Sequence, residues 1–573
     1  MHSHVPAQRG LFEVNIFELA LYLSCSCRLR PCTVYSSRDM ANITRHNFEE
    51  LLPGILSTIE KCDFIALDTE FTGLHFHSDS HNSLFDTPQE RYSKLRQTAS
   101  HFTLCQLGLS AFIKAPSENR YCAHTYNFYL FPRSCSTVDA RFYCQASSIQ
   151  FLCQYGFDFN KLFYEGVSYL SMEAEKELRQ QCQGQESILT SDVDDYLVTN
   201  FTSAISDWLP TAKEGDQLSM TKISDDIVSV QVQALLRDCF PTIWTSQVGT
   251  GEILITKVTP EKRAALLADE TPWIERLFVK LAGFNKVFRH ISELKKPVIG
   301  HNFLTDLLFL HSKFYKPLPA KFKDFKRNIH KLFPHLYDTK FLIMEIRKNL
   351  EEEGLPLAST SLSRVYRALH TDPRKLGVPH MPDIELAENC ARYDQEELFH
   401  EAGFDAYLAG YVFLKMAHYI KAKDTSIMHP KLLTFRKYIP ALAPYENKTN
   451  VIRGSIPYVN IAGEDPASRR PKLLYVTSRG PSPLQAKELA TLFNTYTSVD
   501  VKMIDKRHAL LATSNYGGSK DIMRAFKNDK TIHLAYYNVF QHSKPVRYGL
   551  WGAVAVMGAI SLWVLLGDQS KRQ

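Results

Sequence analysis

The chain has 573 residues, 45% of them hydrophobic and 22% charged, a composition that excludes a disordered protein and predicts two or three folded units. Its formal net charge of +6 is compatible with a polyanionic partner but is too small to indicate one. Twelve scattered cysteines without a C-x-x-C pair argue against structural zinc and a secreted disulfide scaffold, and favour a reducing compartment.

Residues 1–39 are predicted to be a poorly ordered extension. The apolar stretch at 11–25 is interrupted by Glu13, Asn15 and Glu18. A signal peptide has a continuous apolar centre and small residues at its cleavage site, so this stretch does not fit one.

From residue 43 the pattern becomes regular. Residues 43–62 carry apolar side chains at helical spacing, and residues 63–71, 102–112 and 126–131 are apolar runs rich in strand formers. Residues 296–314 are typical of strand, tight turn and helix, the local unit of an α/β fold. We expect an α/β domain in two parts, residues 40–165 and 291–430, with an inserted small domain at 166–290.

A smaller unit is expected at residues 431–545. Its apolar patterns between residues 472 and 540 predict the order strand, helix, strand, strand, helix, strand, which resembles the RNA-recognition-motif fold. The aromatic residues that stack on RNA bases in that fold are missing from the expected third strand. RNA binding and protein packing therefore remain equal alternatives for this unit.

The C-terminal residues 548–567 form a twenty-residue run without a charged side chain. As a helix it would span a hydrocarbon core of about 30 Å. A buried core helix fits poorly, because the run is apolar on all faces and lies at the end of the chain. We predict a transmembrane tail anchor with nearly all of the protein in the cytosol. Basic residues flank the run and tryptophans lie near its ends: Lys544, Arg547, Lys571, Arg572, Trp551 and Trp563.

Asp68 and Glu70 lie two residues apart on the expected strand at 63–71, so their side chains share one face. Neighbouring carboxylates repel each other unless cations lie between their oxygens. Taken alone a D-x-E pattern is weak, since most such pairs are ordinary surface positions. The apolar flanks predict that this pair lies at the exposed end of a central strand.

Two further segments carry acids. A G-H-N turn at residues 300–302 precedes Asp306, which lies among apolar helix residues where an unpaired charge is costly. His400 and Asp405 lie on what we expect to be the final helix of the domain. A cap or salt bridge is the alternative role for Asp306, and an ordinary histidine and a solvated aspartate are the alternatives for the other two.

In kind and order these motifs resemble the DEDDh exonucleases, in which four acids hold two divalent metal ions and a histidine activates water. Two cations can bind the scissile phosphate, lower the pKa of the attacking water and stabilise the leaving 3′ oxygen. Oxygen ligands suit Mg²⁺ or Mn²⁺ rather than zinc. The sister class has a tyrosine four residues before the last aspartate, and Glu401 stands there instead.

Residues 43–417 resemble the poly(A)-specific ribonuclease family still more closely, in the motifs and between them. Matching stretches include ITRHNFEELLP, DFIALDTEFTGL, SSIQFLCQYGFDFNKLF, YDTKFL and HEAGFDAYLAG. The resemblance implies an RNase H-like fold and 3′→5′ exoribonuclease activity. It implies that the metal ligands are Asp68, Glu70, Asp306 and Asp405. It also implies that His400 is the general base. The terminal nucleotides would be held by Phe71, Leu74 and Lys340.

The chain departs from this family in two places. Between His124 and His290 it has no histidine, so the R-x-x-x-H signature of the family's inserted RNA-binding domain is absent and we expect a degenerate insert. The predicted membrane helix is the second departure. Both features resemble the membrane-bound branch of the family, which trims the 3′ ends of PIWI-interacting RNA precursors.

The resemblance implies a trimmer that acts with an RNA-carrying PIWI protein and a Tudor-KH-type scaffold, anchored in the mitochondrial outer membrane or, alternatively, the endoplasmic reticulum, and able to form a homodimer. A poly(A) deadenylase of messenger RNA is the second hypothesis. The third is an RNA-binding or scaffold protein without activity. Suitable residues occupy all five catalytic positions, which argues against the third.

Overall fold

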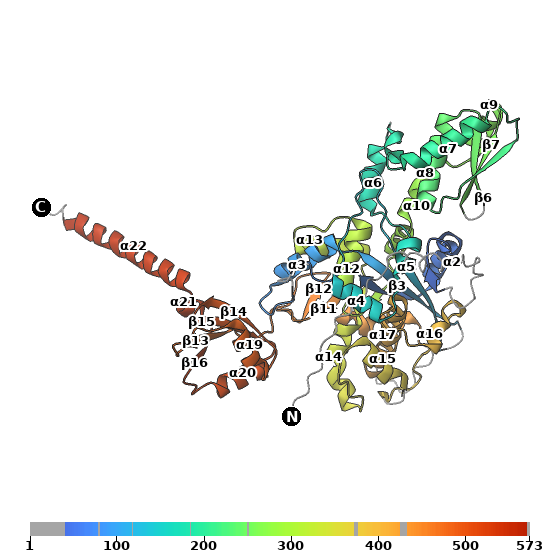
Figure 1. Ribbon diagram of the computed structural model, residues 1–573. Helices are drawn as coiled ribbons and strands as arrows, with labels where there is room; N and C mark the ends of the chain where they lie inside the picture. The colour runs from blue at the N-terminus through green and yellow to red at the C-terminus, as the bar shows by residue number, and fades with distance from the viewer. Residues whose placement is uncertain are drawn as a thin grey trace, which may run out of the picture.

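The computed structural model describes residues 41–77, 81–116, 119–183, 185–248, 251–371, 376–424 and 433–569. The extension predicted at residues 1–39 lies outside these ranges. The described chain comprises a central α/β body, a smaller unit that projects from it, a C-terminal α+β unit and a long terminal helix (Figure 1).

A seven-stranded mixed sheet lies at the centre of the body. Its strands follow the order β1-β4-β3-β2-β8-β9, and β10 pairs with β4. β3 is antiparallel to both β2 and β4. The other pairs are parallel: β8 with β2, β9 with β8, and both β1 and β10 with β4. The expected α/β class is confirmed. The strands are β1 (Asn42–Ile43), β2 (Phe64–Phe71), β3 (Leu104–Lys114), β4 (Arg120–Tyr129), β8 (Val298–Gly300), β9 (Leu336–Asp338) and β10 (Asp383–Leu386).

Helices cover both faces of this sheet. One face packs under α17 (Ala402–Asp424), α14 (Thr339–Glu352) and α15 (Leu362–Thr371). The other packs under α2 (Phe48–Lys61), α3 (Pro88–His101), α11 (Asn285–Leu294), α12 (Leu304–Leu310) and α13 (Phe322–Leu332). Four short helices complete the body: α4 (Ala146–Gln154), α5 (Phe159–Glu165), α16 (Arg392–Gln395) and α18 (Ile439–Leu442).

The start of α17 approaches β3 closely because of one glycine. Gly108 pairs with Asp68 across β2 and β3. A Cβ atom placed on Gly108 would lie 1.8 Å from the carbonyl oxygen of Ala402, the first residue of α17. The absence of a side chain at 108 therefore allows α17 to reach the end of β2.

Gly108→Ala should destabilise the body by about 1–3 kcal/mol, the usual cost of overpacking, because strand or helix backbone must move. Thermal denaturation of the variant measures the loss. Gly54→Ala in α2 is the control, since a Cβ there meets nothing within 4 Å. It should be neutral or slightly stabilising. Equal melting temperatures for the two variants would contradict the close approach.

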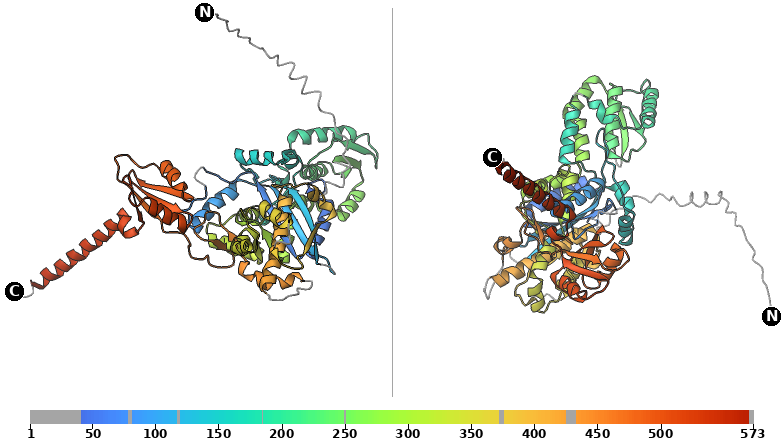
Figure 2. Two further views of the ribbon diagram at one scale, coloured as in Figure 1. Left: turned by 90° about the horizontal axis from the view of Figure 1, so that it is seen from below. Right: turned by 90° about the vertical axis from the view of Figure 1, so that its left-hand side faces the viewer.

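The segment between the two parts of the body projects away from the sheet (Figures 1 and 2). It contains an antiparallel sheet of order β5-β7-β6, and its apolar residues form a core of their own with α7 and α8. Its elements are α6 (Met172–Gln181), α7 (Asp195–Trp208), β5 (Gln217–Met220), α8 (Asp226–Cys239), β6 (Ile243–Val248), β7 (Glu252–Lys257), α9 (Pro260–Asp269) and α10 (Trp273–Ala282).

The first helix is shorter than the expected span of 43–62. β1 pairs in parallel with β4 at residues 42–43, and α2 begins at Phe48. The side chain of Asn47 accepts a hydrogen bond from the Thr44 amide and donates one to the Asn42 carbonyl. These local bonds hold the chain in a turn, so the apolar periodicity alone overestimated the helix.

The C-terminal unit follows the order β13 (Leu474–Ser478), α19 (Ala486–Asn494), β14 (Val499–Asp505), β15 (His508–Thr513), α20 (Tyr516–Ala525) and β16 (Ile532–Tyr536). Its antiparallel sheet has the order β14-β15-β13-β16 and a separate core. A hairpin of β11 (Lys448–Asn450) and β12 (Tyr458–Asn460), which the sequence did not predict, precedes this unit and packs on the body.

The last helix, α22 (Lys544–Gln569), follows the short α21 (Val539–His542). Its residues Pro545–Trp563 form the one described helix that is long and apolar enough to cross a membrane, and 0% of this span is buried. The helix extends away from the rest of the chain in every view (Figures 1 and 2). The basic residues Lys571 and Arg572 lie outside the described part of the chain.

Candidate active site

The alternation of β2 divides its last residues between the two faces of the sheet. Phe64 and Ala66 are buried in the core under α17, and Ile65 and Leu67 in the core under α12. Because successive strand residues point to opposite faces, Asp68 and Glu70 face α17 and Thr69 faces α12. The expected shared face of the two carboxylates is therefore present.

Asp306 joins the site from the α12 side. It is 6% exposed, and its Oδ1 accepts a hydrogen bond of 2.5 Å from Thr69 Oγ1. The turn before α12 includes a left-handed residue, Asn302, with φ +60°. It also leaves no room for a side chain at Gly300, where a Cβ would lie 2.1 Å from the Phe303 ring.

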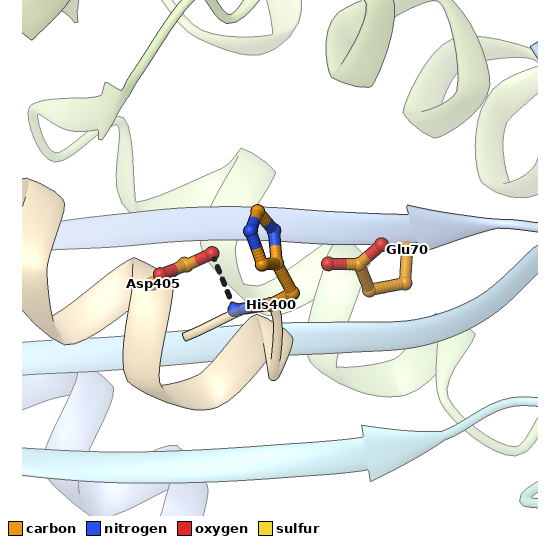
Figure 3. A group of neighbouring side chains, drawn as sticks. All are labelled: Glu70, His400 and Asp405. Carbon is orange, nitrogen blue, oxygen red and sulfur yellow. Dashed lines mark hydrogen bonds between the residues drawn. The ribbon is translucent and has the colours of Figure 1, made fainter. Parts of the chain in front are cut away.

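The sequence analysis predicted His400 on the final helix, and this prediction is wrong. His400 lies two residues before α17 begins. It has φ +66°, and its backbone N–H donates to Asp405 Oδ2 at 3.1 Å. This left-handed residue lets the chain turn back, so that the imidazole and the Asp405 carboxylate lie on the same side. The ring lies between the carboxylates of Glu70 and Asp405 in Figure 3.

The structure brings three of the five predicted residues into direct reach of one another. One ligand atom from each of Glu70, His400 and Asp405 lies within 4.8 Å of the other two. Asp68 and Asp306 line the same cleft. Two aromatic rings of the α4 region, which the sequence did not reveal, flank His400. Their centroids lie 4.9 Å (Phe151) and 4.2 Å (Tyr155) from the imidazole.

Burial and the repulsion between neighbouring acids perturb the four carboxylates. Burial raises the pKa of Asp68 and of Glu70 well above the usual range, and repulsion by Asp405 and Asp306 adds to the rise. Burial also raises the pKa of Asp306 and of Asp405 to about 7. Since the charged groups acting on Asp68 and Glu70 are themselves acids, divalent cations fit this all-oxygen donor set. Burial lowers the pKa of His400, which keeps its imidazole neutral and able to accept a proton.

Removing divalent metal should weaken the fold as the pH rises. In the chelated protein the pKa of Asp306 and Asp405 is raised from 3.8 to about 7, so the folded state binds more protons than the unfolded chain in this window. These groups therefore stabilise the fold at low pH and lose that contribution as pH rises through about 7. Melting temperatures with Mn²⁺ and with chelator should diverge between about pH 4 and pH 7. A difference between the two melting temperatures that stays constant with pH would contradict the raised pKa of Asp306 and Asp405.

The four carboxylates and His400, together called the acidic centre, line a cleft of about 550 Å³. The three residues predicted to hold RNA line it: Phe71, Leu74 and Lys340. Phe71 packs on Phe309 with centroids 4.2 Å apart, and Leu74 is 44% exposed. Lys340 donates from Nζ to the Thr360 carbonyl at 2.9 Å, which holds its stem along the cleft. An apolar ring and an exposed aliphatic side chain can contact a base, and a lysine can contact a phosphate.

Sequence reasoning missed Asp338, although it is part of the YDTKFL stretch. It ends β9 and caps α14, with 1% exposure. The available signal was an acid between a buried strand and a helix, which is typical of a cap. Its further partners come from residues distant in sequence, so that signal did not connect it with the site.

Comparison with known proteins agrees with this geometry. The sequence profile of the CAF1 family ribonuclease matches residues 43–413. Poly(A)-specific ribonuclease PNLDC1 of Homo sapiens is 36% identical over 513 residues, which cover 88% of this chain and 96% of the relative. The pre-piRNA 3′-exonuclease trimmer of Bombyx mori is 31% identical over 534 residues (91% and 98%). Poly(A)-specific ribonuclease PARN of Homo sapiens is 32% identical over 535 residues (88% and 80%).

These matches confirm the resemblance seen in the motifs. The profile covers both parts of the body and includes all five residues of the acidic centre. The CAF1 ribonucleases depend on divalent metal, in keeping with the donor set at the end of β2. The chain therefore belongs to the CAF1 family of ribonucleases and is a ribonuclease similar to the poly(A)-specific enzymes of that family.

Proposed function

We propose that this protein is a 3′→5′ exoribonuclease that trims the 3′ ends of precursor PIWI-interacting RNAs. The observation that carries the enzymatic part is the meeting of four carboxylates, one buried and three half-buried, and a neutral histidine in one cleft. The substrate follows from the Bombyx mori relative, whose name states this activity and which matches 91% of the chain.

In the proposed mechanism Asp68, Glu70, Asp306 and Asp405 would hold two Mg²⁺ or Mn²⁺ ions. When bound, such ions neutralise the scissile phosphate and make a water more acidic. His400 accepts the proton of that water. The water oxygen forms a bond to phosphorus while the bond from phosphorus to the 3′ oxygen breaks. The leaving 3′ oxygen takes a proton from solvent and becomes the new 3′-hydroxyl, and the terminal nucleotide is released as a 5′-monophosphate. Phe71, Leu74 and Lys340 hold that nucleotide and its neighbour.

The domain division expected from sequence is part of the proposal: body parts at 40–165 and 291–430, an insert at 166–290 and a C-terminal unit at 431–545. Separate apolar cores in the insert and in the C-terminal unit from β13 onward support it. Two elements that begin inside the expected ranges, α11 and the β11–β12 hairpin, pack on the body instead. We assign the insert as a degenerate RNA-binding domain and the C-terminal unit as RNA-recognition-motif-like. The order of its strands and helices supports the second assignment.

The proposal also assigns α22 as a tail anchor at 548–567, with the enzyme facing the cytosol from the mitochondrial outer membrane. The exposed apolar surface of the helix supports its insertion into a membrane. The endoplasmic reticulum is the alternative location. At that surface the proposed partners are a PIWI protein that carries the precursor RNA, a Tudor-KH-type scaffold and a second copy of the chain.

A chain that ends at Arg547 should be soluble and should still degrade naked RNA. All five catalytic residues lie upstream of residue 410, and the described span of α22 has no buried part. Trimming in cells should fall, because tethering raises the local concentration of enzyme near membrane-bound partners. Melting temperature and RNA degradation should be compared with those of the full chain in detergent. An unfolded or inactive truncated chain would show that the helix stabilises the catalytic body.

The second candidate function is a poly(A) deadenylase of messenger RNA, since the human relatives are named poly(A)-specific ribonucleases. Sequencing of RNA 3′ ends in cells lacking the protein separates the two. We expect PIWI-associated RNAs to be extended at their 3′ ends and to be restored by the wild-type chain but not by Glu70→Gln. Unchanged small RNAs together with longer poly(A) tails would favour the deadenylase.

A further inference from the structure

The Asp338 carboxylate joins three segments of the body. Its Oδ1 accepts hydrogen bonds from the backbone N–H groups of Asn302 (2.8 Å) and Lys340 (2.9 Å). Its Oδ2 accepts from the N–H groups of Phe303 (3.1 Å) and Asn450 (2.8 Å). One buried side chain thereby ties together the G-H-N turn, the start of α14 and strand β11.

Asn450 also holds a residue that lines the cleft. Its side-chain Nδ2 donates to Asn302 Oδ1 at 2.7 Å, and Asn302 lines the cleft. Asn450 is 4% exposed, so its side chain is a buried donor whose loss leaves the Asn302 oxygen unsatisfied. The G-H-N turn is therefore held by two side chains. The Asp338 carboxylate binds its backbone, and the Asn450 amide binds the side chain of Asn302.

The turn needs such support. Asn302 has φ +60°, a conformation that non-glycine residues rarely adopt, and it must be held by surrounding contacts. Asp306 follows four residues later in the first turn of α12. Displacement of the turn would displace α12 and with it the Asp306 carboxylate.

The β11–β12 hairpin is firmly attached to the body. Asn447 donates from its N–H to the Leu336 carbonyl at 2.7 Å and from Nδ2 to the Pro334 carbonyl at 2.8 Å. Ile456, Val459 and Ile461 are buried in the core that contains α12 and β8. The hairpin lies beyond residue 413, where the match to the CAF1 profile ends.

We propose that the catalytic unit includes the β11–β12 hairpin, and that Asp338 and Asn450 are positioning residues that hold the G-H-N turn, Asp306 and Lys340 in their working arrangement. The inference rests on the proposed metal-dependent exonuclease function. It extends that function by making Asn450 of the hairpin a support of the active centre, although Asn450 is neither a predicted metal ligand nor the general base.

The test is Asn450→Asp in the full chain in detergent. This nearly isosteric change keeps the backbone donor to Asp338 but places a carboxylate oxygen against Asn302 Oδ1. The matched control is Asn460→Asp on the other strand of the hairpin, whose side chain donates to the Glu464 carbonyl at 3.1 Å. For each protein kcat and KM on a 3′-hydroxyl RNA should be measured, together with the rise in melting temperature caused by Mn²⁺.

Asn450→Asp should lower kcat about 10²-fold, the usual cost of misplacing catalytic groups by about 1 Å, with KM little changed. It should also reduce the Mn²⁺-induced rise in melting temperature, whereas Asn460→Asp should retain both properties. Asp338→Asn should lower kcat more than Asn450→Asp does. Its amide NH₂ group would face backbone N–H groups that need an acceptor. Equal kcat and Mn²⁺ response in Asn450→Asp and Asn460→Asp would overturn the inference. The Mn²⁺ response decides this even if the wild-type protein cleaves no RNA, an outcome that would refute the proposed function separately.

Discussion

Glu70→Gln should reduce RNA hydrolysis by about 10³-fold or more and at the same time raise the melting temperature of the chelated protein. Stabilisation of transition-state charge by bound metal is worth several kcal/mol, and about 1.4 kcal/mol corresponds to a tenfold rate change. Glutamine keeps the shape of the side chain but removes a charge that the ions need.

The gain in stability has the same origin as the loss of activity. Burial and repulsion from Asp405 and Asp306 raise the pKa of Glu70, so its charge opposes folding when metal is absent. Removing that charge should relieve the repulsion. Single-turnover RNA cleavage and melting temperatures in chelator at about pH 8 measure the two effects. Glu50→Gln, an exposed acid on α2, should change neither. Activity close to wild type in Glu70→Gln would refute the role of Glu70 as a ligand.

His400→Ala should slow the chemical step by about 10²–10⁴-fold, the usual contribution of a general base. The Mn²⁺-induced rise in melting temperature should remain, because the four carboxylates are still present. The geometry also offers a competing role, since a ring nitrogen of His400 lies within 4.8 Å of ligand atoms of Glu70 and Asp405.

The Mn²⁺ response separates these two roles of His400. As a general base the residue is needed for the rate but not for metal binding, whereas a ligand is needed for both. Loss of the Mn²⁺ response in His400→Ala would therefore make it a metal ligand. His46→Ala, at an exposed position before α2, serves as the control and should retain wild-type rate and metal response.

The sequence predicted those parts of the site that depend on local geometry. Strand alternation placed Asp68 and Glu70 on one face, and the turn before Asp306 was visible as G-H-N. His400 was wrongly placed on the helix, because a helical pattern continues through residues 399–410 in the sequence. The left-handed backbone at His400 and its hydrogen bond to Asp405 interrupt that pattern, and no local signal marks them.

The remaining features depend on contacts between distant segments. Asp338 and Asn450 are 112 residues apart, and their hydrogen bond is made by a backbone N–H that every residue except proline has. β10 is a four-residue strand that pairs with β4 from a distant part of the sequence, and so short an alternation of polar and apolar residues does not predict a strand. Phe151 and Tyr155 lie beside His400 through a contact between the α4 region and the residues just before α17, which are far apart in the sequence.

Hydrolysis of RNA from a free 3′ end with divalent metal is the reaction proposed for the cleft. Incubating the purified full chain with a 5′-labelled single-stranded RNA in Mn²⁺ or Mg²⁺ tests it most directly. We expect stepwise shortening by single nucleotides, release of 5′-monophosphates, no reaction in chelator or with Glu70→Gln, and protection by a blocked 3′ end. Internal cleavage, shortening from the 5′ end, or undiminished activity in chelator would contradict it.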